Sequence, residues 1–134
     1  MGEVRDAAAC ELLSVMNTGH DGSLSTGHAN SPIDMMNRLE TLVLTGMDIP
    51  LAAIRNQIAS ALDIVVQLGR LRDKSRRVLE VDEVMGVRDG KVVLRPIFVF
   101  RETGDERDSL EGKLESTGNE LHHTEKLKRA GLHL

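Results

Sequence analysis

The first half of the chain has three segments in which apolar residues recur at the spacing of an α-helix. Residues 7–16 are apolar at almost every position, which predicts a buried helix. A second helix is predicted over residues 31–46, because Ser31 is a favoured N-cap residue and Pro32 suits the first helical position. A third helix is predicted to follow Pro50, with one apolar face formed by Leu51, Ile54, Ile58 and Leu62.

After residue 63 the pattern changes to the alternation and β-branched content of strands. Strands are predicted over 64–68 and 77–87, with a turn between them, and strand character returns over 91–94 and 97–100, where Pro96 suggests an edge strand or a bulge. Asp89 and Gly90 form the pair that is typical of a type I′ hairpin turn. This half of the chain therefore predicts an antiparallel meander.

The remaining segments are polar. Residues 18–30 are rich in Gly and small polar residues, with a short strand predicted at 23–29. Residues 101–118 are dominated by charged side chains, which predicts a flexible connection, and a last helix is expected over 120–130, ended by Gly131. The element order predicts an α/β fold with part of its sheet missing.

The composition excludes several classes of protein. The 134 residues carry a formal net charge of −4, whereas nucleic-acid coats and membrane-surface proteins are usually basic. With two Phe, no Tyr and no Trp, the chain has almost no side chains on which bases could stack. One cysteine, Cys10, excludes an internal disulfide framework. We therefore expect a cytoplasmic globular protein that binds no nucleic acid.

Several short segments resemble a known family. The start Gly2-Glu3-Val4-Arg5 and the stretch 16–32, MNTGHDGSLSTGHANSP, resemble the Walker B and histidine-box segments of the type II/IV secretion ATPases. Among these, the chain is most similar to the CpaF/TadA-type motors of tight-adherence pilus systems. The resemblance continues in the same order over nearly the whole chain, at 38–41, 54–61, 70–73, 117–119 and the final helix.

This resemblance implies the C-terminal portion of a RecA-like P-loop NTPase domain, with a β-hairpin meander and a C-terminal helix. It places a partial ATPase domain over 1–100 and a polar linker with the last helix over 101–134. For the full-length protein it implies a hexameric motor that uses ATP and Mg²⁺ to drive Flp/Tad pilus assembly or type II/IV protein secretion. Such a motor works at the inner face of the bacterial cytoplasmic membrane, with inner-membrane platform proteins as partners.

The phosphate-binding loop of such motors, GxxxxGK[ST], has no match in this sequence. Gly-Lys occurs at 90–91 and at 112–113. The first pair has Met85 in place of the leading Gly, and the second has Arg107 there. We therefore expect the chain to be a truncated portion of a motor, inactive and without bound cofactor when isolated.

Glu3 corresponds in the resemblance to the Walker B acid. A carboxylate at that position orders a magnesium-bound water or orients the attacking water. Arg5 would lie near the same edge and contact nucleotide. From the residues alone, Glu3 is better interpreted as an ordinary surface carboxylate near the chain terminus, and the resemblance reverses that interpretation. Arg5 is equally well explained as part of an ordinary salt bridge at a helix start.

His20 and His28 match the two histidines of the histidine box. An imidazole beside the γ-phosphate donates a hydrogen bond to it, and loss of that phosphate signals the nucleotide state. Gly19 allows close approach of the backbone to the nucleotide, although turns need glycine as well. The rival interpretations are polar loop chemistry or a metal site, and the latter lacks four ligands at organised spacing.

The basic run over 70–77 has five basic residues and one acid. It is either a solvated hairpin or a patch for a neighbouring subunit or an acidic partner. This gives a second functional hypothesis for the whole chain. In it, the chain is a non-catalytic interaction module that docks on a full-length motor ring through its C-terminal hairpins.

Overall fold

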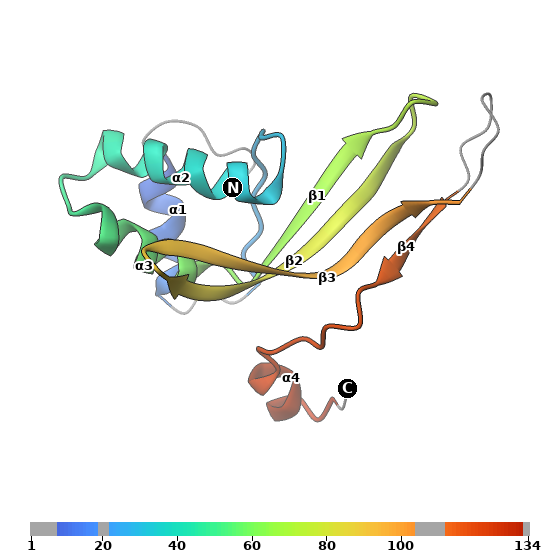
Figure 1. The fold of residues 1–134 in the computed structure, drawn as a ribbon. Helices are drawn as coiled ribbons and strands as arrows, with labels where there is room; N and C mark the ends of the chain where they lie inside the picture. Colours follow the sequence, from blue (N-terminus) through green and yellow to red (C-terminus); the bar gives the residue numbers. More distant parts are fainter. Residues whose placement is uncertain (1–7, 19–21, 104–111, 133–134) are drawn as a thin grey trace. The chain divides into compact units, whose positions relative to one another are not determined.

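The computed structural model describes residues 8–18, 22–103 and 112–132. The described residues form four helices and four strands (Figure 1), in the order α1 (Ala8–Asn17), α2 (Pro32–Gly46), α3 (Leu51–Ala61), β1 (Ile64–Arg70), β2 (Arg76–Arg88), β3 (Lys91–Glu102), β4 (Gly112–Ser116) and α4 (Glu125–Arg129). The strands make one sheet in the order β1-β2-β3-β4. The fold class is α/β, as predicted.

The chain divides into two compact units. The first comprises residues 1–65 and 84–94, and the second comprises 66–83 and 95–134. Strands β2 and β3 each contribute residues to both units. The division at residue 100 that the family resemblance implies stays a prediction.

The first unit is built on the mutual packing of α1, α2 and α3, which all contact one another (Figure 1). Each helix presents one apolar face to this core, as the helical spacing of the sequence predicts. Two valines from β2 and β3 complete the core, whose buried members are Ala9, Leu12, Leu13, Met36, Leu39, Val43, Ile54, Ile58, Ala61, Val84 and Val92.

The predicted helix starts are confirmed. Ser31 has an extended backbone, and its Oγ accepts a hydrogen bond of 3.1 Å from the backbone N–H of Asp34. Pro32 is the first residue of α2, where its missing N–H costs nothing. Pro50 directly precedes α3, and its carbonyl accepts from the backbone N–H of Ile54.

The predicted hairpin turn between β2 and β3 is also confirmed. Asp89 has φ +53° and Gly90 has φ +76°, the pair of positive values that a type I′ turn requires. Beyond it, β3 runs as one strand through Pro96. The pairing with β4 covers only 98–102, and the Pro96 carbonyl accepts instead from the side chains of Thr117 and Asn119, each at 2.8 Å.

Two expectations about extended structure are wrong. Residues 23–29 form no strand beyond a single bridge at Thr26. Conversely, residues 112–116, expected to be part of a flexible connection, form β4, which pairs antiparallel with β3 so that Leu114 lies opposite Phe100. With one apolar residue in five, β4 has too short an alternation to stand out in the sequence.

The last helix is shorter than predicted. Residues 120–130 were expected to be helical, whereas α4 covers Glu125–Arg129. The backbone N–H groups of His122 and His123 bond to the side chain of Glu83, which holds them outside the helix. Its end is as predicted, because Gly131 has φ +81° and the N–H groups of Gly131 and Leu132 bond back to the carbonyls of Lys128 and Leu127.

Truncation of Ile58 tests the three-helix core. Ile58 is fully buried on α3, so Ile58→Ala removes packed methyl groups and leaves a cavity. We expect a loss of about 2–4 kcal/mol in the free energy of unfolding, measured by urea denaturation of the chain. Leu24→Ala is the control, because Leu24 is 84% exposed and should cost less than about 0.5 kcal/mol. Equal losses from both substitutions would contradict this core.

Candidate functional site

Most of the residues expected at a nucleotide site lie outside the described part of the chain. Glu3, Arg5, Gly19 and His20 all fall in the segments 1–7 and 19–21, for which no structure is described. Their expected roles in binding Mg²⁺ and nucleotide stay predictions. Of the expected set, His28 alone has a described position.

His28 lies in the irregular segment between α1 and α2 and is exposed to solvent. Its position depends on Gly27, where a Cβ atom would lie 2.7 Å from Cε and 2.9 Å from Sδ of Met35. A side chain at position 27 would therefore require the end of the Met35 side chain to move. Three residues after His28, the Ser31 cap fixes the direction in which the chain enters α2.

A second polar feature of the first unit joins α2 to α3. The Nε atom of Arg55 lies 2.9 Å from Oε1 of Glu40, and both side chains are largely shielded from solvent. This ion pair forms part of a shallow groove of about 100 Å³, whose other lining residues are Ile33, Met36, Asn37, Lys91 and Val92. The groove is too small for a nucleotide, so it offers no alternative ATP site.

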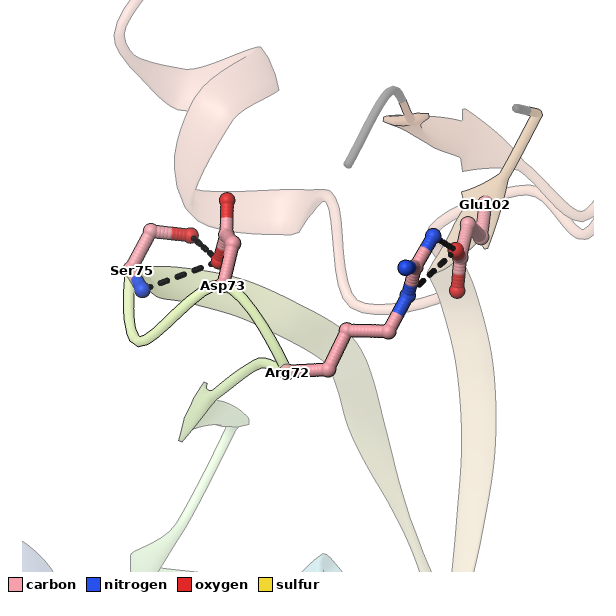
Figure 2. A network of polar contacts seen from close by, with 4 residues as sticks. All are labelled: Arg72, Asp73, Ser75 and Glu102. Carbon is pink, nitrogen blue, oxygen red and sulfur yellow. Dashed lines mark hydrogen bonds and ion pairs between the residues drawn. The ribbon is translucent and has the colours of Figure 1, made fainter. Parts of the chain in front are cut away.

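The basic run between β1 and β2 forms a defined turn in the second unit. Figure 2 shows its polar contacts, in which both Nε and Nη2 of Arg72 bond to Oε1 of Glu102 on β3. Asp73 accepts from the backbone N–H of Ser75 at 2.9 Å and from its hydroxyl at 2.5 Å. The bond from the Ser75 hydroxyl, followed by that from its N–H, lowers the pKa of Asp73. Both carboxylates in this network are thus engaged with near neighbours.

Glu83 on β2 is a buried carboxylate that sequence reasoning did not single out. It has no exposed surface, and its two oxygens accept 2.7 Å hydrogen bonds from the backbone N–H groups of His122 and His123. Nδ1 of His123 lies 2.9 Å from the same carboxylate. We call this arrangement the Glu83 clamp. It fixes the start of the C-terminal segment to β2 within the second unit.

Glu83 and Asp82 are neighbours whose pKa values move in opposite directions. Burial alone would raise the pKa of Glu83, but the N–H groups of His123 and His122 and the charge of His123 outweigh it, so the pKa is lowered. Burial raises the pKa of Asp82 to about 7, helped by a hydrogen bond and by repulsion from Glu80. In the described part of the chain, Oδ1 of Asp82 has no hydrogen-bond partner.

The described residues do not assemble a metal site. Within 8–18, 22–103 and 112–132, no three His, Cys, Asp or Glu side chains lie close enough together to hold a metal ion. Cys10 is half-buried beside the core and donates a weak hydrogen bond to the carbonyl of Val43. None of the helices in these ranges combines the length and the apolar character that a membrane span requires.

The sequence gives only a weak indication that Asp82 and Glu83 are buried. The run Glu80-Val81-Asp82-Glu83 lies within a predicted strand and has three acids in four residues, and such carboxylates normally face water. Nothing local shows that Glu83 will be covered by residues almost 40 positions later in the chain. Burial of these acids is a tertiary effect.

Removal of the Glu83 charge tests the clamp. In Glu83→Gln one carboxylate oxygen becomes an N–H₂ donor that faces a backbone donor, so a charge-assisted bond is lost. We expect the amide protons of His122 and His123 to exchange with solvent at least about tenfold faster, as measured by NMR. The surface ion pair of Glu115 with Arg101 supplies the matched control, since Glu115→Gln should leave both exchange rates within about twofold.

The clamp also has a defined pH range. Because the pKa of Glu83 is lowered from its ordinary 4.5, its stabilising contribution is present above pH 4.5 and is lost as the pH falls through the lower folded value. If the two amides exchanged at the same rate in Glu83→Gln and in the parent chain, the clamp would be contradicted.

Asp82 predicts the opposite dependence on pH. Because its pKa is raised from 3.8 to about 7, the favourable contribution of the protonated form is complete below pH 3.8 and is lost as the pH rises through 7. We therefore expect Asp82→Asn to raise the free energy of unfolding at pH 8 by roughly 1–3 kcal/mol and to change it little near pH 3.5. The exposed residue Asp48 provides the control, as Asp48→Asn should change the free energy of unfolding at pH 8 by less than about 0.5 kcal/mol.

Sequence comparison finds relatives that are named as conjugal transfer and type IV secretion system proteins. The chain is 39% identical over 93 residues to a putative conjugal transfer protein of Mycobacterium tuberculosis, a match that covers 69% of this chain and 26% of that protein. It is 38% identical over 89 residues to the conjugal transfer protein TrbB of Rhizobium radiobacter, covering 66% of this chain and 26% of that one. The chain thus spans about a quarter of the length of the curated relatives that it matches.

Structural comparison points in the same direction. The chain resembles the VirB11 ATPase of the Brucella suis type IV secretion system, solved in complex with sulphate, with a TM-score of 0.56 and 30% identity over 60% of this chain and 25% of that one. This likeness confirms the predicted α/β fold class and is consistent with the C-terminal part of a RecA-like ATPase. The model of the type II/IV secretion system protein family matches residues 1–126. The chain therefore belongs to the type II/IV secretion system protein family.

Proposed function

We propose that this chain forms part of an ATP-hydrolysing motor that powers type II/IV protein secretion or the assembly of a Flp/Tad pilus. The observation that carries the proposal is the family match over residues 1–126. The likeness to the VirB11 ATPase supports it. The narrower assignment, to the CpaF/TadA-type motors, rests on the resemblance of residues 2–5, 16–32 and the further segments along the chain.

In the proposed motor, this chain contributes one side of a nucleotide site. Glu3 orders a magnesium-bound water or orients the attacking water, while Arg5 and Gly19 contact the nucleotide. His20 and His28 donate hydrogen bonds to the γ-phosphate and respond to its loss. The exposure of His28 supports this role, because a phosphate-sensing imidazole must be accessible. The phosphate loop that completes the site comes from residues outside this sequence.

The proposed setting follows from the same resemblance. Six copies of the complete motor form a ring at the cytoplasmic face of the inner membrane, where it engages the platform proteins of the pilus or secretion system. ATP and Mg²⁺ are its cofactors. Nucleic acid is not expected as a partner, because the net charge is −4 and aromatic side chains are almost absent.

A chimaera tests the catalytic proposal. Residues 1–126 replace the corresponding segment of the TrbB relative, and steady-state ATP hydrolysis is measured. We expect Glu3→Gln and His28→Ala each to lower kcat on the order of 10²-fold, because each removes a group that acts at the γ-phosphate. Asn30→Ala is the matched control in the same exposed segment and should stay within about twofold of the unsubstituted chimaera.

Two outcomes would contradict the proposal. One is full activity of His28→Ala and Glu3→Gln in a chimaera that hydrolyses ATP. The other concerns the isolated chain, for which we expect no ATP turnover above the buffer rate, since it has no GxxxxGK[ST] loop. Turnover by the isolated chain that Glu3→Gln removes would show that it holds a complete site.

The alternative function is a non-catalytic module that docks on a full-length motor ring through the β-hairpins. The exposed basic turn between β1 and β2 favours it over other binding roles. The two functions differ in one readout: the module binds the ring without altering its nucleotide site, whereas the motor part restores hydrolysis in the chimaera.

A further inference from the structure

Two acids on β2 form a carboxyl pair inside the second unit. Asp82 is 2% exposed, and Oδ1 of its carboxyl has no hydrogen-bond partner among the described residues. Glu80 lies two residues earlier, on the same face of the strand, and both its hydrogen bond and its charge act on Asp82. An ionised carboxyl in this setting would leave water without gaining hydrogen bonds, which is costly. The geometry therefore favours a protonated Asp82.

The next residue along the strand is Glu83, which holds the C-terminal segment through the Glu83 clamp. Its two oxygens accept from the N–H groups of His122 and His123 at 2.7 Å. Asp82 and Glu83 share a peptide unit, so a displacement of the Asp82 backbone moves the acceptor of the clamp with it. Any change that expels Asp82 from its buried position therefore acts on the clamp.

The C-terminal segment has a second attachment of different chemistry. The N–H of Thr117 donates to the carbonyl of Ile97 at 2.9 Å, and the side-chain amide of Asn119 donates to the carbonyl of Pro96 at 2.8 Å. Both bonds join the segment to β3, and neither involves a carboxyl or an imidazole. Opening of the clamp can therefore free the residues from 120 onward while 117–119 stay attached to β3.

The surroundings of Asp82 give its response to pH a definite sign. Burial, followed by the hydrogen bond and the charge of Glu80, raises the pKa of Asp82 from 3.8 to about 7. The favourable contribution of the protonated form is complete below pH 3.8 and is lost as the pH rises through about 7. The response therefore falls in the neutral range.

The other charged groups in this part of the sheet are engaged elsewhere or exposed. On β2 itself, Glu83 is paired with Nδ1 of His123 at 2.9 Å. Where β1 begins, the backbone carbonyl of Asp63 bonds to β2, but its side chain is exposed. On β3, Arg95 bonds to Oδ1 of Asn119 at 3.3 Å. Glu80 is thus the charged residue among those described that acts on the pKa of Asp82.

We propose that the Glu80–Asp82 pair is a proton switch for the C-terminal segment: the protonated pair keeps the Glu83 clamp closed, and loss of its proton to solvent near neutral pH opens the clamp and releases residues 120–132. The ionised carboxylate of Asp82 gains water only if this part of β2 moves, and Glu83 then loses its backbone donors. The proposal rests on side chains that this chain itself covers and is independent of the proposed ATPase role.

Hydrogen exchange of the 134-residue chain, followed by NMR at pH 6 and pH 8, tests the switch. After correction for the intrinsic effect of pH on exchange, we expect the protection of the His122 and His123 amides to fall roughly tenfold between the two values. A carboxyl whose pKa is about 7 when buried and 3.8 when exposed predicts this ratio. Because the opening is local, both amides should exchange faster than that of Leu62, which bonds to the carbonyl of Ile58.

Three variants separate the switch from a general effect of pH. Asp82→Asn cannot ionise, so the protection of both amides should change by less than about twofold between pH 6 and pH 8. Glu80→Gln removes the repulsion, so the midpoint of the Asp82 carboxyl titration, followed by carbon-13 NMR, should fall by at least about half a pH unit. Asp48→Asn removes an exposed carboxylate and should keep the full change of the parent chain.

The proposal is overturned if the two amides are equally protected at pH 6 and pH 8, or if Asp82→Asn keeps the tenfold change. Exchange of both amides at the rate of Leu62 would also overturn it, because only global unfolding would then expose them. The titration of Asp82 in the parent chain needs no variant: a midpoint near 7 supports the switch, and a midpoint near 3.8 excludes it.

Discussion

Burial of the apolar faces of α1, α2 and α3 against one another is the interaction on which the rest of the first unit depends. Isolated helices of 10 to 15 residues are marginal in water, so these three owe their stability to the shared core rather than to propensity. The same core includes Val84 of β2 and Val92 of β3, so the turn end of the β2–β3 hairpin packs against the helices. The segment that carries His28 is then placed by its attachment to α2.

The second unit depends on a polar constraint instead. Glu83 is adjacent in sequence to Val84 of the first core, yet it receives two backbone N–H groups and an imidazole from the C-terminal segment. A carboxylate with no exposed surface is tolerated only when its oxygens are bonded in this way. Asp82 shows the contrast. Its Oδ1 has no hydrogen-bond partner among the described residues, and its raised pKa means that the neutral form of the carboxyl is favoured.

The sequence predicted the features that depend on local chemistry. The three large helices follow from apolar spacing and from Ser31, Pro32 and Pro50, and the β2–β3 turn follows from Asp89 and Gly90. The expectations that were wrong concern features that depend on contacts between residues far apart in the sequence. The last helix starts late because Glu83 holds residues almost 40 positions away, and β4 forms because β3 offers Phe100 opposite Leu114. Of the nucleotide-site residues, only His28 lies in the described part, where it is exposed.

The close approach of Gly27 to Met35 has a chemical consequence for the segment that carries His28. The end of the Met35 thioether lies where a side chain at position 27 would begin, so it occupies the space that the glycine leaves open. Oxidation of Met35 to the sulfoxide would place a polar, branched group beside Gly27. Met35 is therefore the side chain through which a chemical change on α2 would first reach the segment that carries His28.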